Sequence, residues 1–325
     1  MFKDKKVLVA GGTGMIGRQL VHMLIDRGAK VRIASMDNPG RAHPQAEFMR
    51  LDLMNFENCQ KACDGMEYIF NLVGIKGSPQ AAKTRPASFF VPTVLCNTNI
   101  SEAARRAQPL WYLYTSSVGV YSPADIFKED SVWKTFPSEN DKFAGWAKRM
   151  GELQLESYKI EYGFNNYSII RPANVYGPFD NFDPKNSMVI PSLIKRAVDG
   201  ENPFIVWGDG APIRDFVHAA DVARVMLFAV ENKISEPLNI GSGKGIAIKD
   251  LVNIIINNLQ NKPDVVWDTS KPSGDAVRIM DVSRISSHGF KTIISFEDGV
   301  KEVMEWYKNN KQNLDAGYNV FKKTK

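Results

Sequence analysis

The sequence predicts an α/β fold, in which a doubly wound parallel sheet is followed by a smaller C-terminal lobe. Through the first half of the chain, short apolar runs typical of buried strands alternate with segments whose apolar residues recur at helical spacing. Parallel neighbours in a sheet need a crossover connection, and this alternation supplies one after each strand. After residue 177 the chain becomes richer in Pro, Gly and Asn, which indicates a change of architecture.

The elements follow in order from the N-terminus. Residues 6–10 (KVLVA) form a continuous apolar run, as expected of a strand buried on both faces. The next segment, 11–28, has apolar residues at helical spacing and ends in a glycine, and VRIAS at 31–35 predicts the second strand. Further strands are predicted at 47–53, 68–74, 111–117 and 167–172, and helices at 98–107 and about 142–161.

The turn between the first strand and the first helix carries Gly11, Gly14 and Gly17. In a dinucleotide-binding turn, such glycines allow a tight bend, close approach of the backbone to a pyrophosphate, and close packing of helix on strand. The following helix N-terminus favours the negative charge. Because the motif lies between a strand and a helix, it predicts a Rossmann-type domain that binds NAD or NADP.

This interpretation divides the chain near residue 180. We expect residues 1–180 to form the dinucleotide-binding domain, and 181–325 to form mostly a substrate lobe. The segment at about 212–242 is expected to return to the first domain.

The preference between NAD and NADP depends on the end of the second strand. NAD-binding domains usually carry an acid there, which holds the ribose 2′-hydroxyl. Ser35 occupies that position, whereas Asp37 lies two residues later and Arg41 is close enough to meet a 2′-phosphate. We therefore favour NADP slightly. Asp52 and Leu53, after the third strand, lie where such folds reach the adenine.

Composition excludes several other classes of protein. The chain has 325 residues and a formal net charge of +5, spread along its length, so no basic face for nucleic acid is expected. No apolar run of about 18 residues is present, which argues against a membrane span.

The odd number of cysteines (Cys59, Cys63 and Cys96) indicates free thiols in a reducing compartment, most simply the cytoplasm. Four scattered histidines argue against a metal site.

Several motifs together resemble the extended short-chain dehydrogenase/reductase family of NAD-dependent epimerases and dehydratases. They are GGTGMIG (11–17), TSSVGVY (115–121), the helix around Lys148, and RPANVYGP (171–178). More narrowly, residues 177–197, 206–223, 237–248 and 272–285 are similar to the GDP-fucose synthases of that family. The resemblance extends from about residue 5 to 308.

The resemblance implies hydride transfer between a nicotinamide and a sugar carbon, usually carbon 4. It assigns the sugar-binding hydroxyl to Ser117, with Ser116 as the alternative, and the lysine that holds the nicotinamide ribose to Lys148. With the glycine turn, it predicts cofactor contacts at Gly11, Thr13, Gly14, Met15, Ile16, Gly17, Ser35, Arg41, Asp52, Leu53, Leu72, Val73, Lys148, Pro172 and Val175. It predicts nucleotide-sugar contacts at Asn174, Val189, Arg196, Trp207, Arg214 and Arg278.

The resemblance fails at one catalytic position. The family places a tyrosine four residues before the lysine, where it exchanges a proton with the sugar oxygen, but Ala144 stands there. Phe143 has no hydroxyl and Trp146 offers only an N–H, while Tyr121 is expected to serve packing. Three explanations remain open: a substituted, impaired enzyme, which we favour; an enzyme with another acid or a water; or a binding protein without turnover.

Two further departures limit the reaction. The positions that carry the acid and base of 3,5-epimerisation are occupied by Val118 and Met188, which cannot exchange protons. A 4-reductase or a 4-epimerase is therefore expected, acting on a nucleotide sugar for which the resemblance suggests a GDP link. A 4,6-dehydratase is the alternative enzyme, although Val118 and Gly119 stand where that reaction needs an acid pair. The family also implies a homodimer, formed through a four-helix bundle of the helices at 98–107 and 142–161.

Overall fold

A seven-stranded parallel sheet lies at the centre of the larger lobe of the computed structural model, which describes residues 1–75, 83–183, 186–271, 274–314 and 317. The strand order is β11-β6-β5-β4-β1-β2-β3, and each neighbouring pair is parallel. The seven strands are β1 (Lys6–Ala10), β2 (Lys30–Ser35), β3 (Glu47–Arg50), β4 (Tyr68–Asn71), β5 (Trp111–Thr115), β6 (Tyr167–Pro172) and β11 (Leu238–Ile240). The predicted doubly wound sheet is confirmed.

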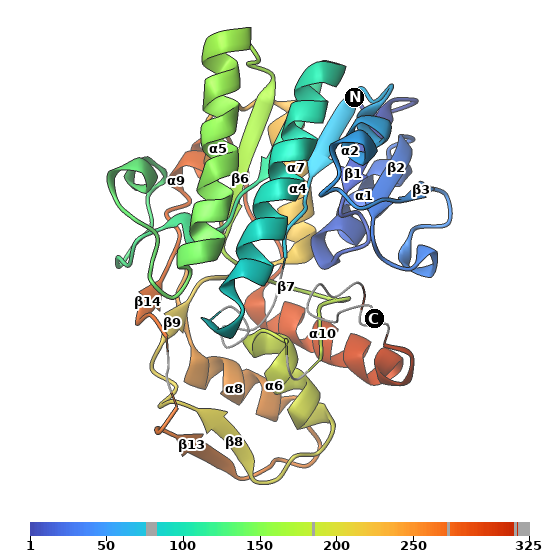
Figure 1. Cartoon of the computed structure of the whole chain (residues 1–325). Coiled ribbons are helices and arrows are strands. Elements are labelled where there is room, and N and C mark those ends of the chain that lie inside the picture. Colours follow the sequence, from blue (N-terminus) through green and yellow to red (C-terminus); the bar gives the residue numbers. More distant parts are fainter. Residues whose placement is uncertain (76–82, 184–185, 272–273, 315–316, 318–325) are drawn as a thin grey trace.

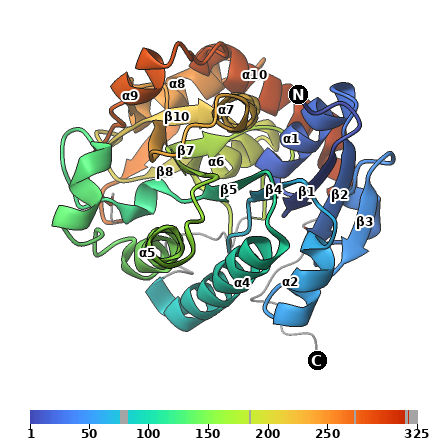
Figure 2. The same ribbon diagram turned by 90° about the horizontal axis from the view of Figure 1, so that it is seen from above.

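Helices cover both faces of this sheet (Figure 2). On one face lie α1 (Met15–Asp26) and α7 (Ala219–Glu231), which pack against each other. On the other lie α2 (Phe56–Cys63), α4 (Pro86–Ala107) and α5 (Lys142–Tyr162), with α4 between its two neighbours. Each face has its own cluster of buried side chains, so the sheet is covered on both sides.

The second lobe lies below the carboxyl ends of the sheet strands (Figure 1). Its helices α6 (Val189–Val198), α8 (Ile248–Asn257) and α10 (Phe296–Asn310) enclose a third cluster of buried side chains. The remaining strands are β7 (Asn174–Tyr176) with β10 (Phe216–His218), β8 (Phe204–Trp207) with β13 (Val265–Asp268), and β9 (Ile213–Arg214) between β12 (Ile246–Ala247) and β14 (Val277–Arg278).

Short elements complete the chain. They are α9 (Ser283–Ser287) and the 3-10 turns η1 (Pro39–Arg41), η2 (Val118–Val120), η3 (Glu129–Lys134) and η4 (Lys311–Asn313). In the range 212–242, α7 and β11 pack with the large sheet, whereas β9 joins the small sheet of the second lobe. Ile285 and Phe290, from a later segment, also pack on the large sheet.

The helix predicted at 98–107 begins twelve residues earlier, at Pro86. Pro86 lies at its first position, where no N–H partner is needed, while Pro92 is buried within the helix. Phe89, Cys96 and Ile100 are buried along this helix, and their packing stabilises it on both sides of Pro92. All three cysteines are buried free thiols, as predicted.

No helix in the described ranges is long and apolar enough to cross a membrane. Among the same residues, no group of three or more His, Cys, Asp or Glu side chains is placed to hold a metal ion.

Candidate functional site

The glycine turn brings the backbone of β1 and α1 into close contact. Gly11 has a positive φ of 82°, which favours glycine, and its α-carbon faces the backbone of Leu72 on the neighbouring strand end. A Cβ atom on Gly17 would lie 2.3 Å from the Gly11 carbonyl oxygen, so only glycine fits there. Gly14 precedes α1, and no side chain of the described residues caps that helix. The first N–H groups of α1, from Met15 and Ile16 onward, therefore suit a phosphate.

A compact polar cluster joins the glycine turn to the end of β2. The Thr13 hydroxyl donates to Asp37 Oδ2 at 2.6 Å and lies 2.8 Å from Ser35 Oγ. Arg41 Nε is 3.6 Å from the same Asp37 oxygen. Asp37 thus contacts the glycine turn directly, although the sequence favoured Ser35 for this place. The positive charge of Arg41 balances that of Asp37.

A hollow of about 320 Å³ opens next to this cluster. Besides Arg41, its lining includes Arg18, His22 and His43, so four basic side chains surround it. Farther along the sheet edge, Asp52 accepts the N–H of Met54, and Leu53 is buried in the cluster under α2.

Lys148 lies at the carboxyl ends of the two central strands. Its ammonium donates to the carbonyl oxygens of Val73, just after β4, and Thr115, the last residue of β5, both at 2.8 Å. The residue is only 8% exposed, and burial lowers the pKa of its ammonium to about 7. The Tyr114 hydroxyl donates to the Lys148 carbonyl, which further fixes this turn of α5.

Of the two candidate serines, only Ser117 presents its hydroxyl near the start of α5. Its Oγ accepts the N–H of Gly119 at 3.1 Å, and the residue is half-buried. Ser116 is buried instead, and its hydroxyl donates to Glu152 on α5. This contact already engages the Ser116 hydroxyl with a buried carboxylate.

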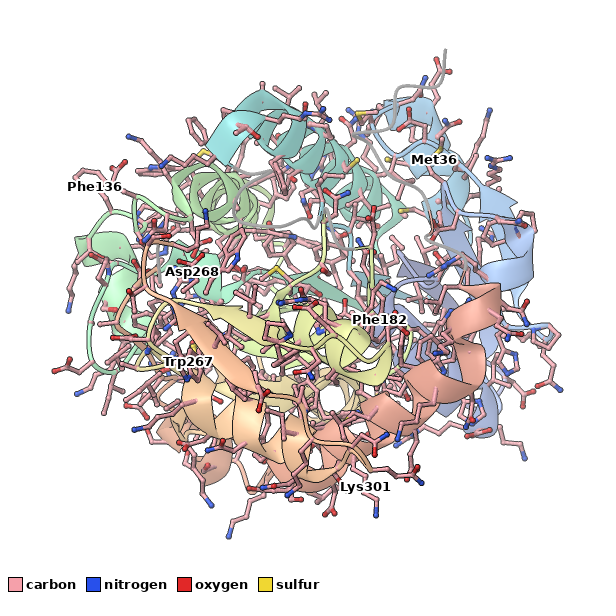
Figure 3. All side chains as sticks on the ribbon, turned by 90° about the horizontal axis from the view of Figure 1, so that it is seen from below. Met36, Phe136, Phe182, Trp267, Asp268 and Lys301 are labelled. Carbon is pink, nitrogen blue, oxygen red and sulfur yellow. The ribbon has the colours of Figure 1, made fainter. Side chains whose placement is uncertain are left out.

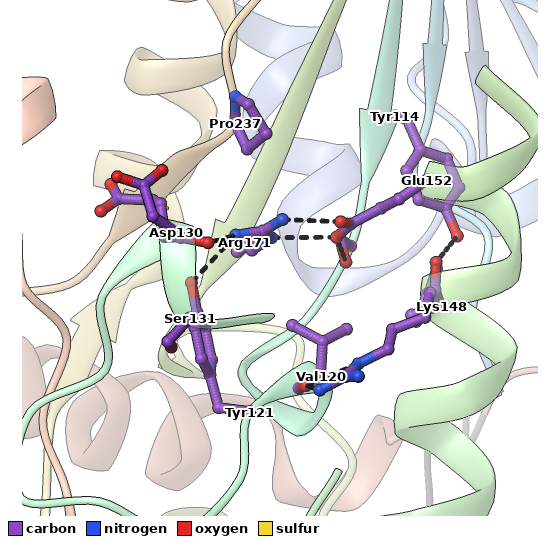
Figure 4. A network of polar contacts seen from close by, with 12 residues as sticks. Tyr114, Val120, Tyr121, Asp130, Ser131, Lys148, Glu152, Arg171 and Pro237 are labelled. Atoms are coloured by element: carbon purple, nitrogen blue, oxygen red, sulfur yellow. Dashed lines mark hydrogen bonds and ion pairs between the residues drawn. The ribbon is translucent and has the colours of Figure 1, made fainter. Parts of the chain in front are cut away.

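Glu152 belongs to a buried polar network beneath the site (Figure 4). It forms a two-point ion pair with Arg171 on β6, in which both side chains are at most 2% exposed. Arg171 also donates to the Tyr121 hydroxyl and to the Glu129 carbonyl. The network joins β6 and α5 to the loop that carries Ser117, and therefore holds Ser117 and Lys148 in a fixed relation.

Ala144 lies one helical turn before Lys148 and beside the Ser117 loop. The next residue explains this proximity, because a Cβ atom on Gly145 would be 2.2 Å from the Gly119 carbonyl. Positions four apart on a helix share one face, so Ala144 and Lys148 point the same way. The residue at position 144 is half-buried in this contact region.

None of the aromatic side chains near Ala144 in sequence is a tyrosine that points toward Lys148, and each has other contacts. Phe143 packs edge-on against Phe90, and Trp146 contacts Phe136, which projects from the edge of the molecule (Figure 3). Tyr121 stacks on Phe127, and its hydroxyl donates to Asn239 within the buried network. Tyr121 thus serves packing, as expected.

The basic side chains predicted for the nucleotide sugar fall into two groups. Arg278 and Arg214 lie on adjacent strands, β14 and β9. Arg278 forms ion pairs with Asp141, at the start of α5, and with Asp275. Burial, and then the charge of Arg278, lowers the pKa of Arg214 to about 10, so both guanidinium groups are charged at neutral pH.

Arg196 lies apart from that pair. It is near the end of α6, where its guanidinium forms an ion pair with Glu201 and donates to the Ile205 carbonyl. Trp207, at the end of β8, is 59% exposed and is therefore not a core residue. Val189 begins α6, and Asn174 on β7 donates to the Asp215 carbonyl. Pro172 and Val175 lie at the end of β6 and on β7.

Sequence reasoning missed three acids of this site: Asp141, Asp275 and Glu152. Glu152 follows Lys148 by four residues on the same helix, a spacing that could have identified it. Asp141 had no such signal, because its partner Arg278 is far away in sequence, whereas Asp275 precedes Arg278 by only three residues.

Known proteins share this arrangement. The NAD dependent epimerase/dehydratase family matches residues 7–241. The chain belongs to this family. GDP-L-fucose synthase 1 of Arabidopsis thaliana is 29% identical over 317 residues, which cover 95% of this chain and 94% of that protein.

Two solved structures of similar proteins have the same fold. A UDP-N-acetylglucosamine 4-epimerase from Methanobrevibacter ruminantium is 26% identical, with a TM-score of 0.84 and coverage of 95% of this chain and 99% of that one. A GDP-mannoheptose C4 reductase from Campylobacter jejuni, with NADP bound, is 24% identical, with a TM-score of 0.80 and the same coverages. The seven-stranded sheet and glycine turn are therefore those of the NAD-dependent epimerases and dehydratases.

Proposed function

We propose that this chain is an NADP-dependent oxidoreductase that acts at carbon 4 of a nucleotide sugar, as a reductase or a 4-epimerase. The observation that carries the proposal is the position of Lys148. Its ammonium joins the ends of β4 and β5 while Ser117 follows the same β5, so a cofactor ribose and a sugar oxygen would meet there. In open parallel sheets, ligands bind at this carboxyl edge.

The proposed cofactor contacts extend along that edge. The glycine turn and α1 would hold the pyrophosphate, Asp52 and Leu53 would border the adenine, and Leu72 and Val73 would border the nicotinamide side. When bound, the cofactor supplies or accepts a hydride. The hollow with Arg18, Arg41 and two histidines favours NADP, because a 2′-phosphate adds two negative charges.

The proposed substrate contacts come from the second lobe, for which we retain the division near residue 180. Arg214 and Arg278 would pair with the diphosphate, since a planar, charged guanidinium matches phosphate oxygens. Trp207, being exposed, is available to pack on the base. Arg196 is already satisfied by Glu201 and Ile205, so we propose a weaker contribution from it. The similarity to a GDP-L-fucose synthase favours a GDP-linked sugar.

Ala144 makes the proposed enzyme slow rather than changing its reaction. A positioned proton donor contributes roughly 10²–10⁴-fold to such reactions, and this position lacks one. Val118 and Met188 remain unable to support 3,5-epimerisation, and Val118 with Gly119 offers no acid pair for a 4,6-dehydratase. The same alanine favours the second candidate, a nucleotide-sugar-binding protein without turnover.

One experiment separates these two candidates. Calorimetric titration with NAD, NADP and a panel of GDP-, UDP- and dTDP-sugars is followed by assays of cofactor oxidation or reduction, in the unsubstituted chain and in Ala144→Tyr. We expect NADP to bind more tightly than NAD, and Ala144→Tyr to raise turnover at least about 10-fold. Tight binding of both ligands with no turnover in Ala144→Tyr would establish the binding protein instead.

A homodimer is also proposed. Apolar side chains are exposed on the outer surface of α4 and α5, notably Val91, Leu95, Leu153 and Ile160. Two copies of this helix pair would bury them in a four-helix bundle. Sedimentation at micromolar concentration tests the dimer, and Leu153→Glu with Ile160→Glu should convert it to a monomer.

A further inference from the structure

Reduction at carbon 4 of a keto sugar requires a proton at the sugar oxygen, and the reverse oxidation requires a base there. The family tyrosine does this work, but Ala144 replaces it. The question is which described group near Ser117 can exchange a proton at neutral pH.

The other titratable groups around this point are already committed. Asp141 is ion-paired with Arg278, and Glu152 is paired with Arg171. Burial raises the pKa of the Cys96 thiol to about 12 and that of the Tyr114 phenol well above its usual value, so both stay protonated. A serine hydroxyl such as Ser117 is too weak an acid to act without a base.

Resting on the function proposed above, we propose that Lys148 itself donates the proton to, and accepts it from, the sugar oxygen, through one water molecule held between its Nζ and Ser117 in the space beside Ala144. Lys148 thereby changes from a residue that assists a tyrosine into the general acid and base.

The contacts of Lys148 suit this role. Its two hydrogen-bond partners are neutral carbonyl oxygens, so two of the three ammonium hydrogens are used and the third can be shared between the cofactor ribose and a water. No carboxylate of the described residues forms an ion pair with Nζ, and the position of a Cβ atom on the exposed Gly74 is 3.7 Å from Nζ. Ala144 carries only a methyl group, which is smaller than the phenol ring that the family places at this position.

The charges around Lys148 permit both protonation states. Burial is the largest influence and lowers its pKa to about 7, while Cys96 on α4 and Glu152 on α5 act weakly in the opposite direction. Tyr114 on β5 presents its ring 5.3 Å from Nζ, and its hydroxyl donates to the helix backbone. A group with a pKa near the working pH is well suited to general acid–base catalysis.

The bonds broken and formed in the proposed proton transfer balance. As carbon 4 receives the hydride, the carbonyl π pair becomes a lone pair on the sugar oxygen. The N–H bond of Lys148 breaks, a water O–H bond forms, and the water passes its other proton to the sugar oxygen. The neutral amine then takes a proton from solvent. Oxidation of the alcohol follows the same route in reverse and requires the neutral amine.

The first test measures Lys148 without any turnover. Competitive acetylation of the free chain, followed by mass spectrometry across pH 5–10, reports the protonation of each lysine. Lys148 should become reactive near pH 7, and exposed Lys159, at the other end of the same helix, provides the internal reference. Titration of Lys148 together with Lys159 would overturn the proposal.

The second test follows reduction of GDP-4-keto-6-deoxymannose by NADPH. In the unsubstituted chain, kcat/KM should fall as pH rises through about 7, because the ammonium is the acid; in Ala144→Tyr the fall should move to higher pH. Lys148→Arg keeps the positive charge but cannot release a proton, and should lose at least about 100-fold in kcat. Lys159→Arg is the matched control and should leave kcat unchanged.

Chemical rescue separates proton transfer from a structural role. Lys148→Ala, checked for folding by circular dichroism, should regain turnover with added methylamine in proportion to the amine concentration. No rescue in a folded, NADPH-binding variant would overturn the proposal. Turnover in Ala144→Tyr alone would also overturn it while leaving the proposed function intact, whereas inactivity of both chains would refute the proposed function itself.

Discussion

The two halves of α5 hold their charges in different ways. In its middle, Glu152 is paired with Arg171, and both are almost completely buried within one network of the large domain. At its start, Asp141 is paired with Arg278 of the second lobe, and 30% of the Asp141 side chain remains exposed. The first pair can only be structural, because no ligand can reach it. The second lies between the lobes, where an anionic ligand can compete with the carboxylates for the arginine.

The largest expected effect comes from breaking the inner pair. Arg171→Met leaves the Glu152 carboxylate buried without its partner, which should cost about 3–5 kcal/mol of the free energy of unfolding. Urea denaturation measures this loss. The double variant Arg171→Met with Glu152→Leu removes both charges and should recover much of it. A double variant as unstable as the single one would show that the pair contributes net stability by itself.

A smaller effect is expected where α5 contacts the serine loop. In Gly145→Ala, the new Cβ atom would meet the Gly119 carbonyl at 2.2 Å and Pro137 at 2.7 Å, so the loop must shift. Such overpacking typically costs about 1–3 kcal/mol. We expect kcat to fall as well, since Ser117 moves with this loop.

The comparison variant is Gly151→Ala, in the middle of α5. Its Cβ atom would lie 2.3 Å from the Tyr114 hydroxyl, inside the domain. Gly151→Ala should reduce thermal stability about as much as Gly145→Ala but should lower kcat less. The ratio of kcat loss to stability loss should therefore be larger for Gly145→Ala. Equal ratios would contradict a specific link between Gly145 and the serine loop.

The outer pair should affect ligand binding more than stability. Arg278→Ala removes a proposed diphosphate contact and should raise KM for the nucleotide sugar roughly 10- to 100-fold, which corresponds to about 1.4–2.8 kcal/mol. Arg278→Lys keeps the positive charge without the planar guanidinium, so its KM should lie between that of the unsubstituted chain and that of Arg278→Ala. Steady-state kinetics and calorimetry measure both, with the free energy of unfolding as the control. A large loss of stability with unchanged KM would assign Arg278 to structure alone.

Much of the fold could be predicted from sequence because the signals are local. The apolar runs of the buried strands and the glycine turn are each contained in a few residues, and the parallel arrangement of the strands follows from their crossover connections. Ser117, Lys148 and Ala144 could be located from short motifs. The Asp141–Arg278 contact could not, because it joins segments 137 residues apart that only the folded lobes bring together. Likewise, nothing in the spacing of Ser35 and Asp37 revealed that Thr13 selects Asp37 as its acceptor.

The smallest effect is expected outside the site, where α4 meets the far half of α5. Hydrogen bonds from Arg105 are the main reason that the pKa of Glu102 falls to about 2, and Arg106 contributes as well. Because its folded pKa is depressed, Glu102 stabilises the fold above its unfolded pKa of about 4.3, and this contribution is lost as pH falls toward 2. Glu102→Gln should therefore lower the free energy of unfolding by less than about 1 kcal/mol at pH 7, because the ion pairs of Glu102 with Arg105 and Arg106 are partly exposed. Near pH 2 the substitution should not change the free energy of unfolding. Urea denaturation at several pH values measures the difference in the free energy of unfolding between the unsubstituted chain and Glu102→Gln. A difference that persists at pH 2 would show that Glu102 stabilises α4 through packing rather than charge.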